Sequence, residues 1–397
     1  MTSHFKNMLY LFGANATGRS VQTEDEVNIE EIRRLAIEQG IWTMVYPELA
    51  KLCDTSQYQI GFFQAVSQGI AKKEFNLKMI RRLEDAGIRC CLLKGAALSG
   101  LYNDPECRVS SDTDILINPD DEKRAKEFLK RNGYSVEDRL KQSHHTQGYH
   151  PIGGLIEVHV ALYSEEKTKL LFNGLDMYSE PWTKMEIGGY SYNVLGINDG
   201  LMYLTAHYIK HLVSEGGGVR QMMDLLLYIE KYREKIDFDR YNKILKELKY
   251  DKLIDVVKTV GAKYFGFNYE IKYESLADEI LSDSEKGGIF GHEADDRKNF
   301  YDAYCDRRTT MSKYGYKAFI MFRSYKNIFN KLFPNSQRMV NIYGYKYAKN
   351  KALLPVAWLN RYFDILFGRR KSIIRERKET GVESRLKMMR DLGMISK

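Results

Sequence analysis

Two aspartates are spaced in the sequence so that both could bind one divalent cation. Asp112 and Asp114 stand two residues apart in the run Asp-Thr-Asp-Ile-Leu-Ile. Residues two apart in a β-strand lie on the same face, so both carboxylates would face one side. Mg²⁺ takes carboxylate oxygens as ligands, together with water and substrate phosphate. The pair indicates a cation site, although acid-x-acid spacing also arises by chance in a chain with 53 acidic residues.

A second alternating run adds a third carboxylate. Along 156–160, apolar residues alternate with Glu157 and His159, which places this carboxylate and this imidazole on one face of another strand. Like charges on a sheet face repel each other unless a cation compensates them. We therefore expect Asp112, Asp114 and Glu157 to converge on one metal site. His159 would orient Glu157 or the acceptor, or else only cap the sheet edge.

A glycine at a strand-to-helix junction forms a candidate phosphate site. Residues 88–94 are a short, largely apolar run typical of a buried strand, and Gly95 leads into a helical turn of small residues. Glycine lets backbone N–H groups approach an anion at the start of a helix. Lys94 and Gly95 are therefore candidates for phosphate binding, although close packing of the strand against the helix would also require glycine.

Together these residues resemble the polymerase-β-like nucleotidyltransferase superfamily, specifically its poorly characterised bacterial branch with a Leu-Lys-Gly start. The resemblance covers about residues 90–162, with softer likeness through 198–233. It rests on Leu93-Lys-Gly95, Tyr102, Arg108, Ser111 to Leu116, Gly133-Tyr134 and Glu157-Val-His159. It implies an α+β fold, with a small mixed β-sheet core flanked by helices. It also implies transfer of a nucleoside monophosphate from a nucleoside triphosphate, such as ATP, to an acceptor, with release of pyrophosphate.

The resemblance also implies roles for individual residues. Asp112 and Asp114 would hold two Mg²⁺ ions, with Mn²⁺ as the alternative, and Glu157 would complete the metal site and activate the acceptor. The residues expected to bind the nucleotide are Lys94, Gly95, Arg108 and Ser111.

Two positions depart from the superfamily pattern. The usual Gly-Ser of the first motif is Gly95-Ala96, so Lys94 would replace the serine hydroxyl, and the third acid is Glu157 rather than aspartate. Two classes of function therefore stay open. One is a Mg²⁺-dependent enzyme whose non-templated acceptor is a small molecule, a protein side chain or an RNA terminus. The other is a catalytically decayed fold that binds nucleic acid, a membrane surface or another protein. The retention of three carboxylates favours the enzyme.

Three further residues have two interpretations each. Arg108 directly precedes the aspartate strand and would hold phosphate or the acceptor, or form a structural ion pair. Arg220 and Asp224 are four apart on an expected helix, where they would pair on its surface or line the nucleotide cleft, supporting the site residues or contacting the acceptor.

The histidines give weaker signals. His207 and His211 have zinc-compatible spacing but lack a His-Glu-x-x-His pattern. His144 and His145 precede an expected hairpin, and adjacent strand residues face opposite sides, so at most one of them should reach the site.

Periodicity divides the chain into four expected regions. Helical spacing dominates the N-terminal helical region 1–84, and strands and helices mix in a catalytic core at 85–197. Helical spacing returns in a substrate and nucleotide-cleft domain at 198–310. A basic, aromatic, helical region occupies 311–397.

Charge is concentrated in the last of these regions. Residues 311–397 contain 20 Lys and Arg against 5 Asp and Glu, with 14 aromatic residues, whereas residues 1–310 have a net charge of −7. Such a surface suits phosphates or lipid headgroups, but we favour a solvated face over packed aromatic residues, because Trp358, Leu359, Tyr362, Ile365 and Leu366 recur at helical spacing.

Composition constrains the location of the protein. Five cysteines without C-x-x-C spacing and the lack of any apolar run of 18 residues predict a cytoplasmic protein with no transmembrane segment.

Overall fold

The computed structural model describes most of the chain up to residue 288 and short stretches beyond it. The described residues are 1–20, 23, 27–137, 144–164, 171–173, 177–214, 216–288, 300–301, 304, 347, 350, 353–366 and 380–395. The chain forms two compact units, Met1–Cys305 with Ser384–Lys397, and Asp306–Glu383. The finer division into four functional regions stays a prediction. Within the described parts, no helix has the length and apolarity needed to cross a membrane.

The N-terminal part is helical, as the periodicity predicts. Its helices are α1 (Ser3–Thr17), α2 (Ile29–Glu38), α3 (Trp42–Leu52) and α4 (Ser56–Asp85). Asn28 begins α2 by accepting a hydrogen bond from the Glu31 N–H, which satisfies one of the N–H groups left open at a helix start. The apolar residues of α1 lie on nearly all sides of the helix, as expected for a buried element.

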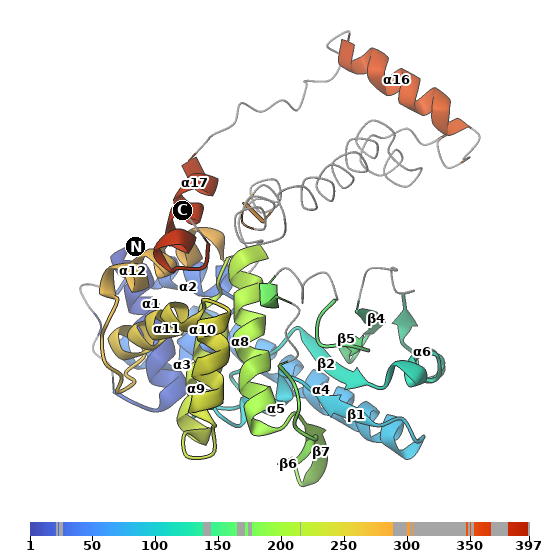
Figure 1. The fold of residues 1–397 in the computed structure, drawn as a ribbon, viewed down its shortest axis with the longest axis horizontal. Helices are drawn as coiled ribbons and strands as arrows, with labels where there is room; N and C mark the ends of the chain where they lie inside the picture. Colours follow the sequence, from blue (N-terminus) through green and yellow to red (C-terminus); the bar gives the residue numbers. More distant parts are fainter. Residues whose placement is uncertain are drawn as a thin grey trace. The chain divides into compact units, whose positions relative to one another are not determined.

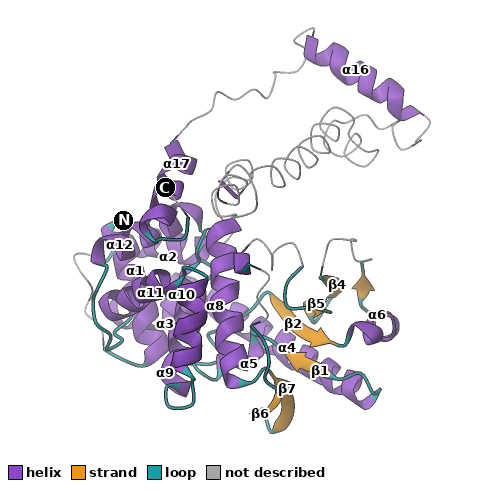
Figure 2. Cartoon of the chain, in the orientation of Figure 1, coloured by secondary structure: helices purple, strands orange, loops and turns teal. Residues whose placement is uncertain are grey.

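A seven-stranded mixed sheet lies to one side of the first unit, beside most of its helices (Figure 2). Its strands are β1 (Cys90–Leu92), β2 (Asp112–Ile117), β3 (Ser135–Val136), β4 (His145–His150), β5 (Gly154–His159), β6 (Thr183–Ile187) and β7 (Tyr190–Val194). The spatial order is β3-β4-β5-β2-β1-β7-β6. Strand β2 is parallel to β5 and antiparallel to β1, and β4 and β5 form the expected hairpin.

One face of this sheet is buried against helices. Ile115 and Ile117 of β2 and Ile156 and Val158 of β5 belong to one core cluster, to which α4 contributes Leu77, Ile80 and Leu83. Full burial of each such side chain contributes about 1.5–3 kcal/mol. The apolar positions of both strands therefore face the core, as their alternation predicts, and the acidic positions are directed to the opposite face.

Further helices lie between the strands in the sequence and after the last strand (Figure 1). Short elements near β1 and β2 are α5 (Ala96–Ser99), η1 (Pro119–Asp121) and α6 (Glu122–Arg131). After the sheet come α8 (Ile197–Ser214), α9 (Val219–Tyr232), α10 (Phe238–Glu247), α11 (Asp251–Tyr264) and α12 (Glu274–Gly287). The helical spacing expected from residue 198 onward is confirmed by α8 and α9. The fold is thus α+β, a mixed sheet with helical regions before and after it.

The basic C-terminal region is described only in part. Helix α16 (Leu354–Leu366) confirms the expected helix around Trp358, and α17 (Thr380–Asp391) follows it. In α16, Ala357 is buried, whereas Val356 and Leu359 are exposed. The side chains of residues 361–366, and the basic cluster 369–371, lie outside the described residues.

Candidate active site

Strand register brings an aspartate and a glutamate side by side. Asp114 of β2 is the pairing partner of Glu157 on the parallel strand β5. His159, two residues further along β5, donates through Nε2 to Asp114 Oδ1 at 3.0 Å, and Nε2 lies 3.5 Å from Glu157 Oε2. Ligand atoms of these three residues lie within 4.8 Å of one another. The expected outward placement of both strands' polar side chains is therefore what the structure shows.

Lys94 lies close to both aspartates. Its Nζ lies 3.3 Å from Asp114 Oδ2 and 3.9 Å from Asp112 Oδ2. Burial, the largest effect, lowers the pKa of Lys94, but the charges of Asp114, Asp112 and Glu157 outweigh it and raise this pKa. Lys94 therefore stays protonated and compensates part of the negative charge on this face.

Asp112 occupies a separate position at the start of β2. Its Oδ1 accepts a hydrogen bond from Ser110 Oγ at 3.1 Å, and it is connected to Asp114 through the shared Lys94. Among the described residues, the close groups of metal-ligand atoms include Asp114, Glu157 and His159 but not Asp112. The structure thus brings two of the three expected carboxylates, Asp114 and Glu157, close together, and Asp112 lies outside this group.

Hydrogen bonds and imidazoles hold Glu157 in its ionised form. Gln147 of β4 donates to Glu157 Oε1 at 2.8 Å, and His145 Nε2 lies 3.7 Å from the same oxygen. Burial alone would raise the pKa of Glu157, but bonding to His159, the charge of His145 and the bond from Gln147 lower it far below its ordinary value. Burial lowers the pKa of His159 and the Asp114 and Glu157 carboxylates reverse this, so its pKa is raised.

Arg108 forms a buried ion pair with a helix of the second half of the unit. Its guanidinium donates to Asp224 through Nε at 2.9 Å and NH2 at 2.7 Å. Its NH1 donates to the Gly95 carbonyl at 2.9 Å, and the Tyr102 hydroxyl donates to Asp224 Oδ1 at 2.7 Å. Arg108 and Asp224 are 7% and 6% exposed. Of the two interpretations of Arg108, the structural ion pair is therefore the one seen.

Arg220 and Asp224 do not pair on the surface of α9. Asp224 is buried with Arg108, and Arg220 NH1 donates to the Val109 carbonyl at 3.2 Å. Burial and the nearby Arg108 charge lower the pKa of Arg220. Both α9 side chains thus contact the segment that leads into β2, and the surface-pair interpretation is wrong for Asp224.

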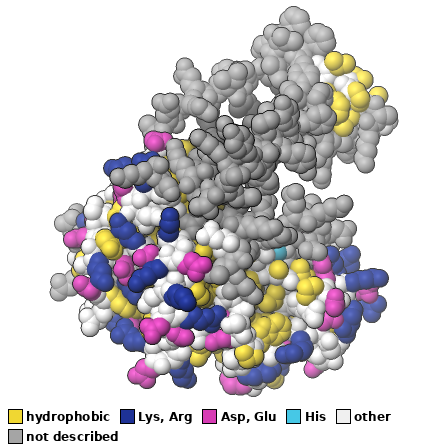
Figure 3. Space-filling view, viewed as in Figure 1, with side chains coloured by type: hydrophobic (Ala, Val, Ile, Leu, Met, Phe, Trp, Pro, Cys, Tyr) yellow, Lys and Arg dark blue, Asp and Glu magenta, His cyan; other side chains and the backbone are white. Residues whose placement is uncertain are grey.

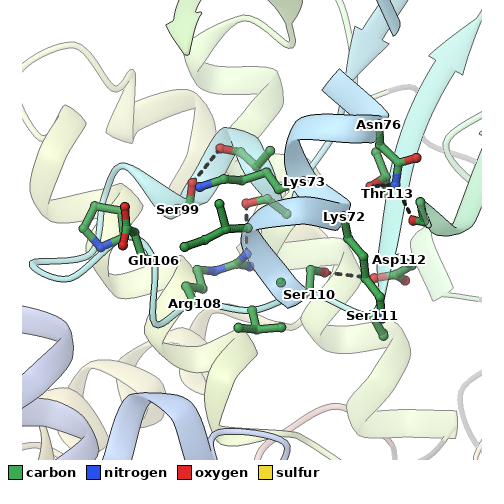
Figure 4. A pocket seen from close by; sticks show the side chains of 17 residues that line it. Lys72, Lys73, Asn76, Ser99, Glu106, Arg108, Ser110, Ser111, Asp112 and Thr113 are labelled. Atoms are coloured by element: carbon green, nitrogen blue, oxygen red, sulfur yellow. Dashed lines mark hydrogen bonds between the residues drawn. The ribbon is translucent and has the colours of Figure 1, made fainter. Parts of the chain in front are cut away.

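A pocket opens between α4 and the segment before β2 (Figure 4). Lys72 and Lys73 of α4 lie on one side of it, and Ser110, Ser111 and Asp112 on the other. Its lining also includes Gly95, Ala96, Ser99, Arg108 and Thr113. Of the expected nucleotide-binding residues, Gly95, Arg108 and Ser111 thus line one pocket, with Asp112 beside them, and Lys94 lies among the carboxylates.

Gly95 has a backbone conformation that few other residues adopt. Its φ is 63° and its ψ is −107°, and α5 after it is only one turn long. Glycine is therefore required at this junction by its conformation. A phosphate-binding role for its N–H stays a prediction.

The prediction for the two adjacent histidines is wrong. The rings of His144 and His145 lie 5.3 Å and 5.1 Å from that of His159, so both approach the site. Strand β4 begins at His145, and alternation between faces does not extend to the residue before a strand.

Several residues near the carboxylates were missed in the sequence. Gln147 bonds Glu157, Ser110 bonds Asp112, and Tyr203 of α8 is buried near Asp114, whose charge helps burial to raise the tyrosine pKa. The β4–β5 hairpin register would have identified Gln147, which pairs with Glu157 across the two strands. Nothing local distinguishes Tyr203, because its position depends on packing of α8.

Two of the solved structures that are similar to this chain are described as an adenylyltransferase and a nucleotidyltransferase-like protein. One is a lincosamide antibiotic adenylyltransferase, LnuA, bound to lincomycin, at 13% identity over 40% of this chain and 94% of that one, with a TM-score of 0.29. The other is an antigenic nucleotidyltransferase-like protein from Paracoccidioides brasiliensis, at 14% identity over 49% and 93% of the chains, with a TM-score of 0.29. No curated protein matches the chain.

The family comparison covers the sheet and the helices around it. The model of a family described as "uncharacterised nucleotidyltransferase" matches residues 25–266, which is more than half of the chain. The match spans Lys94, both aspartates, Glu157 and the Arg108–Asp224 pair. The chain therefore belongs to this nucleotidyltransferase family.

Proposed function

We propose that this nucleotidyltransferase moves a nucleoside monophosphate from a nucleoside triphosphate to a non-templated acceptor in a Mg²⁺-dependent reaction that releases pyrophosphate. The observation that carries the proposal is the pairing of Asp114 with Glu157 on adjacent parallel strands, with Asp112 at the start of the same β2 strand. This arrangement supports a Mg²⁺ site, because Mg²⁺ takes carboxylate oxygens together with water and substrate phosphate.

The residues fit a divalent cation. Asp114 Oδ2 is buried and makes no hydrogen bond among the described residues, although Lys94 Nζ lies 3.3 Å away. A carboxylate oxygen with unused acceptor capacity is an available ligand for a divalent cation. Glu157, whose lowered pKa keeps it ionised, supplies a second oxygen ligand beside it. Asp112, Asp114 and Glu157 would therefore hold Mg²⁺, which when bound neutralises charge on the transferring phosphoryl group.

The proposed reaction exchanges one P–O bond for another. The acceptor oxygen bonds to the α-phosphorus, the bond from that phosphorus to the β-phosphate bridge breaks, and pyrophosphate leaves. A strongly lowered pKa makes Glu157 a weak proton acceptor, so we assign it to cation binding and assign the acceptor's proton to solvent. Lys94 lies protonated beside both aspartates. With the carboxylates bound to Mg²⁺, its ammonium group would be available to contact phosphate oxygens.

A labelled-nucleotide assay tests this proposal. The chain is incubated with Mg²⁺ and each of the four α-labelled nucleoside triphosphates in a metabolite and RNA extract, and pyrophosphate and labelled products are measured. We expect one nucleotide to give stoichiometric pyrophosphate and a product heavier by one nucleoside monophosphate. Absence of both with every nucleotide, while triphosphate binding persists, would support the decayed binding module instead.

A further inference from the structure

Three histidines surround a point next to the carboxylate pair. The ring centroids of His144 and His145 lie 4.9 Å apart, and those of His145 and His159 lie 5.1 Å apart. One ring nitrogen from each of the three lies within 4.8 Å of the others. This group shares only His159 with the group of Asp114, Glu157 and His159. The His159 imidazole therefore belongs to two groups of possible metal ligands.

His159 is held with one nitrogen turned to a carboxylate. Its Nε2 bonds Asp114 Oδ1, and because a carboxylate accepts but does not donate, Nε2 carries the proton of that bond. Its Nδ1 is buried and has no hydrogen-bond partner among the described residues. In the neutral ring, Nδ1 therefore presents an unused lone pair inside the protein, which is costly without a partner. Metal-binding histidines adopt this arrangement, giving the other N–H to a carboxylate.

We propose that His144, His145 and His159 bind one transition-metal ion of the Zn²⁺ class, at a site distinct from the carboxylate site for Mg²⁺. Imidazole nitrogen suits Zn²⁺, whereas Mg²⁺ takes oxygen ligands, so the donor set separates the two ions. Tetrahedral coordination at about 2.0–2.1 Å from each nitrogen would require the nitrogens to stand about 3.3 Å apart. Binding would therefore draw the three nitrogens, which lie within 4.8 Å of one another, closer together, with water as the fourth ligand.

The proposal does not rest on the proposed nucleotidyl transfer, since binding of the metal alone is measured without nucleotide or acceptor.

Calorimetry with ZnCl₂ on the full chain tests the site. The chain is stripped with chelator and titrated in excess Mg²⁺, which occupies the carboxylate oxygens. We expect one Zn²⁺ per chain, with affinity reduced at least about tenfold by His144→Ala, whose side chain belongs to the histidine group alone. His4→Ala in α1 removes a half-buried histidine outside the group and should leave the affinity unchanged. Equal affinity in wild type and His144→Ala, or no binding by wild type, would overturn the proposal.

A second measurement does not depend on any variant folding. Co²⁺ added to the wild-type chain should give the intense visible absorption bands of a tetrahedral, nitrogen-rich site, and equimolar Zn²⁺ should abolish them by displacement. Weak bands typical of octahedral oxygen coordination would show that the ion sits on the carboxylates, and the histidine site would be rejected.

Discussion

Asp114 is a buried carboxylate that has both a hydrogen bond and an ion pair. It is 1% exposed, bonded to His159 and close to Lys94, so its negative charge is compensated within the fold. Replacing it by asparagine removes the charge that both partners face, while keeping the size. The substitution should therefore affect stability as well as catalysis, because Lys94 would lose the carboxylate closest to it and keep Asp112 at 3.9 Å.

We predict that Asp114→Asn reduces nucleotide transfer at least about 100-fold and lowers the free energy of unfolding by about 1–3 kcal/mol. Labelled-nucleotide turnover and urea unfolding measure the two effects. Asp239→Asn makes the same change at an exposed position of α10 and should alter neither. Full activity in Asp114→Asn would remove Asp114 from the catalytic set.

At Gly95, the backbone conformation can be tested separately from the room available for a side chain. A Cβ added there would meet its nearest atoms, Asp112 O and Ser110 Oγ, only at 3.8 Å, so it fits sterically. Its φ of 63° with a ψ of −107° is nevertheless unfavourable for any residue with a side chain.

We predict that Gly95→Ala lowers the free energy of unfolding by about 1–3 kcal/mol. Gly61→Ala, in exposed open space within α4, should raise it by about 0.5–1 kcal/mol, because alanine favours the helix. Chemical denaturation of both variants measures this. Opposite signs are the expected result, and a stable Gly95→Ala chain would mean that the junction relaxes to another backbone conformation.

The residue types of the site could be predicted from the sequence, but their grouping could not. Alternation along two short runs was enough to place Asp114, Glu157 and His159 on one face. The separation of Asp112 from this group could not be predicted, because it depends on Ser110 and on the start of β2. The approach of His144 depends on where β4 begins, which no local pattern marks.

At the scale of elements, the Arg108–Asp224 ion pair connects the segment before β2 to helix α9. Arg108 bonds Asp224 with two nitrogens and the Gly95 carbonyl with a third, so α9 supports the backbone at the strand-to-helix junction. Arginine provides this planar, forked geometry, and lysine does not.

We predict that Arg108→Lys and Asp224→Asn each weaken binding of a non-hydrolysable triphosphate analogue. The double variant should bind the analogue no more weakly than whichever single variant binds it less tightly. This non-additivity follows because both residues act through one pair. Titration calorimetry on the four chains measures it. Additive losses would mean that the two side chains contact the nucleotide independently.

Helix α8 carries a histidine whose titration should appear in the stability of the chain. Burial and, next, the charge of Lys94 hold the pKa of His207 well below its ordinary value of 6.5. The unfolded chain therefore binds a proton near pH 6.5 that the folded chain does not. Folding stability falls as pH drops below that value, because protons favour the unfolded state.

We predict that His207→Gln flattens the loss of stability between pH 7 and pH 5.5, by at most about 1.4 kcal/mol per pH unit. Urea unfolding at several pH values, with His4→Gln as the matched control, measures the slope. A pH dependence identical to that of wild type would show that His207 is protonated in the folded chain.

Elements with clear periodicity were predicted well, and elements defined by packing were not. The α8 and α9 helices and the β4–β5 hairpin follow from apolar spacing and a turn with two glycines. Strands β6 and β7 were missed because Thr183–Ile187 and Tyr190–Val194 are largely polar, and their pairing is set by a tight turn at Gly188 and Gly189, both with positive φ.

At the scale of the whole molecule, charge is distributed unevenly along the sequence. On the face shown in Figure 3, Lys and Arg side chains of the described residues are interspersed with Asp and Glu. Residues 311–397 instead have a net charge of +15. Contact of this region with a polyanion stays a prediction, and its rival is a solvated face over packed aromatic residues.

Salt dependence distinguishes these two roles of the basic region. Each phosphate neutralised by Lys or Arg releases counterions, so log affinity for nucleic acid falls with log salt by about 0.7–0.9 per contact. If the region docks on RNA, reversing the charge of Arg369, Arg370 and Lys371 should flatten this slope by about two to three. The same reversal at exposed Lys78, Lys123 and Lys130, outside the basic region, should leave the slope unchanged. Filter binding of single-stranded RNA across a salt series measures both, and no binding by wild type even at low salt would assign the basic residues to solvation alone.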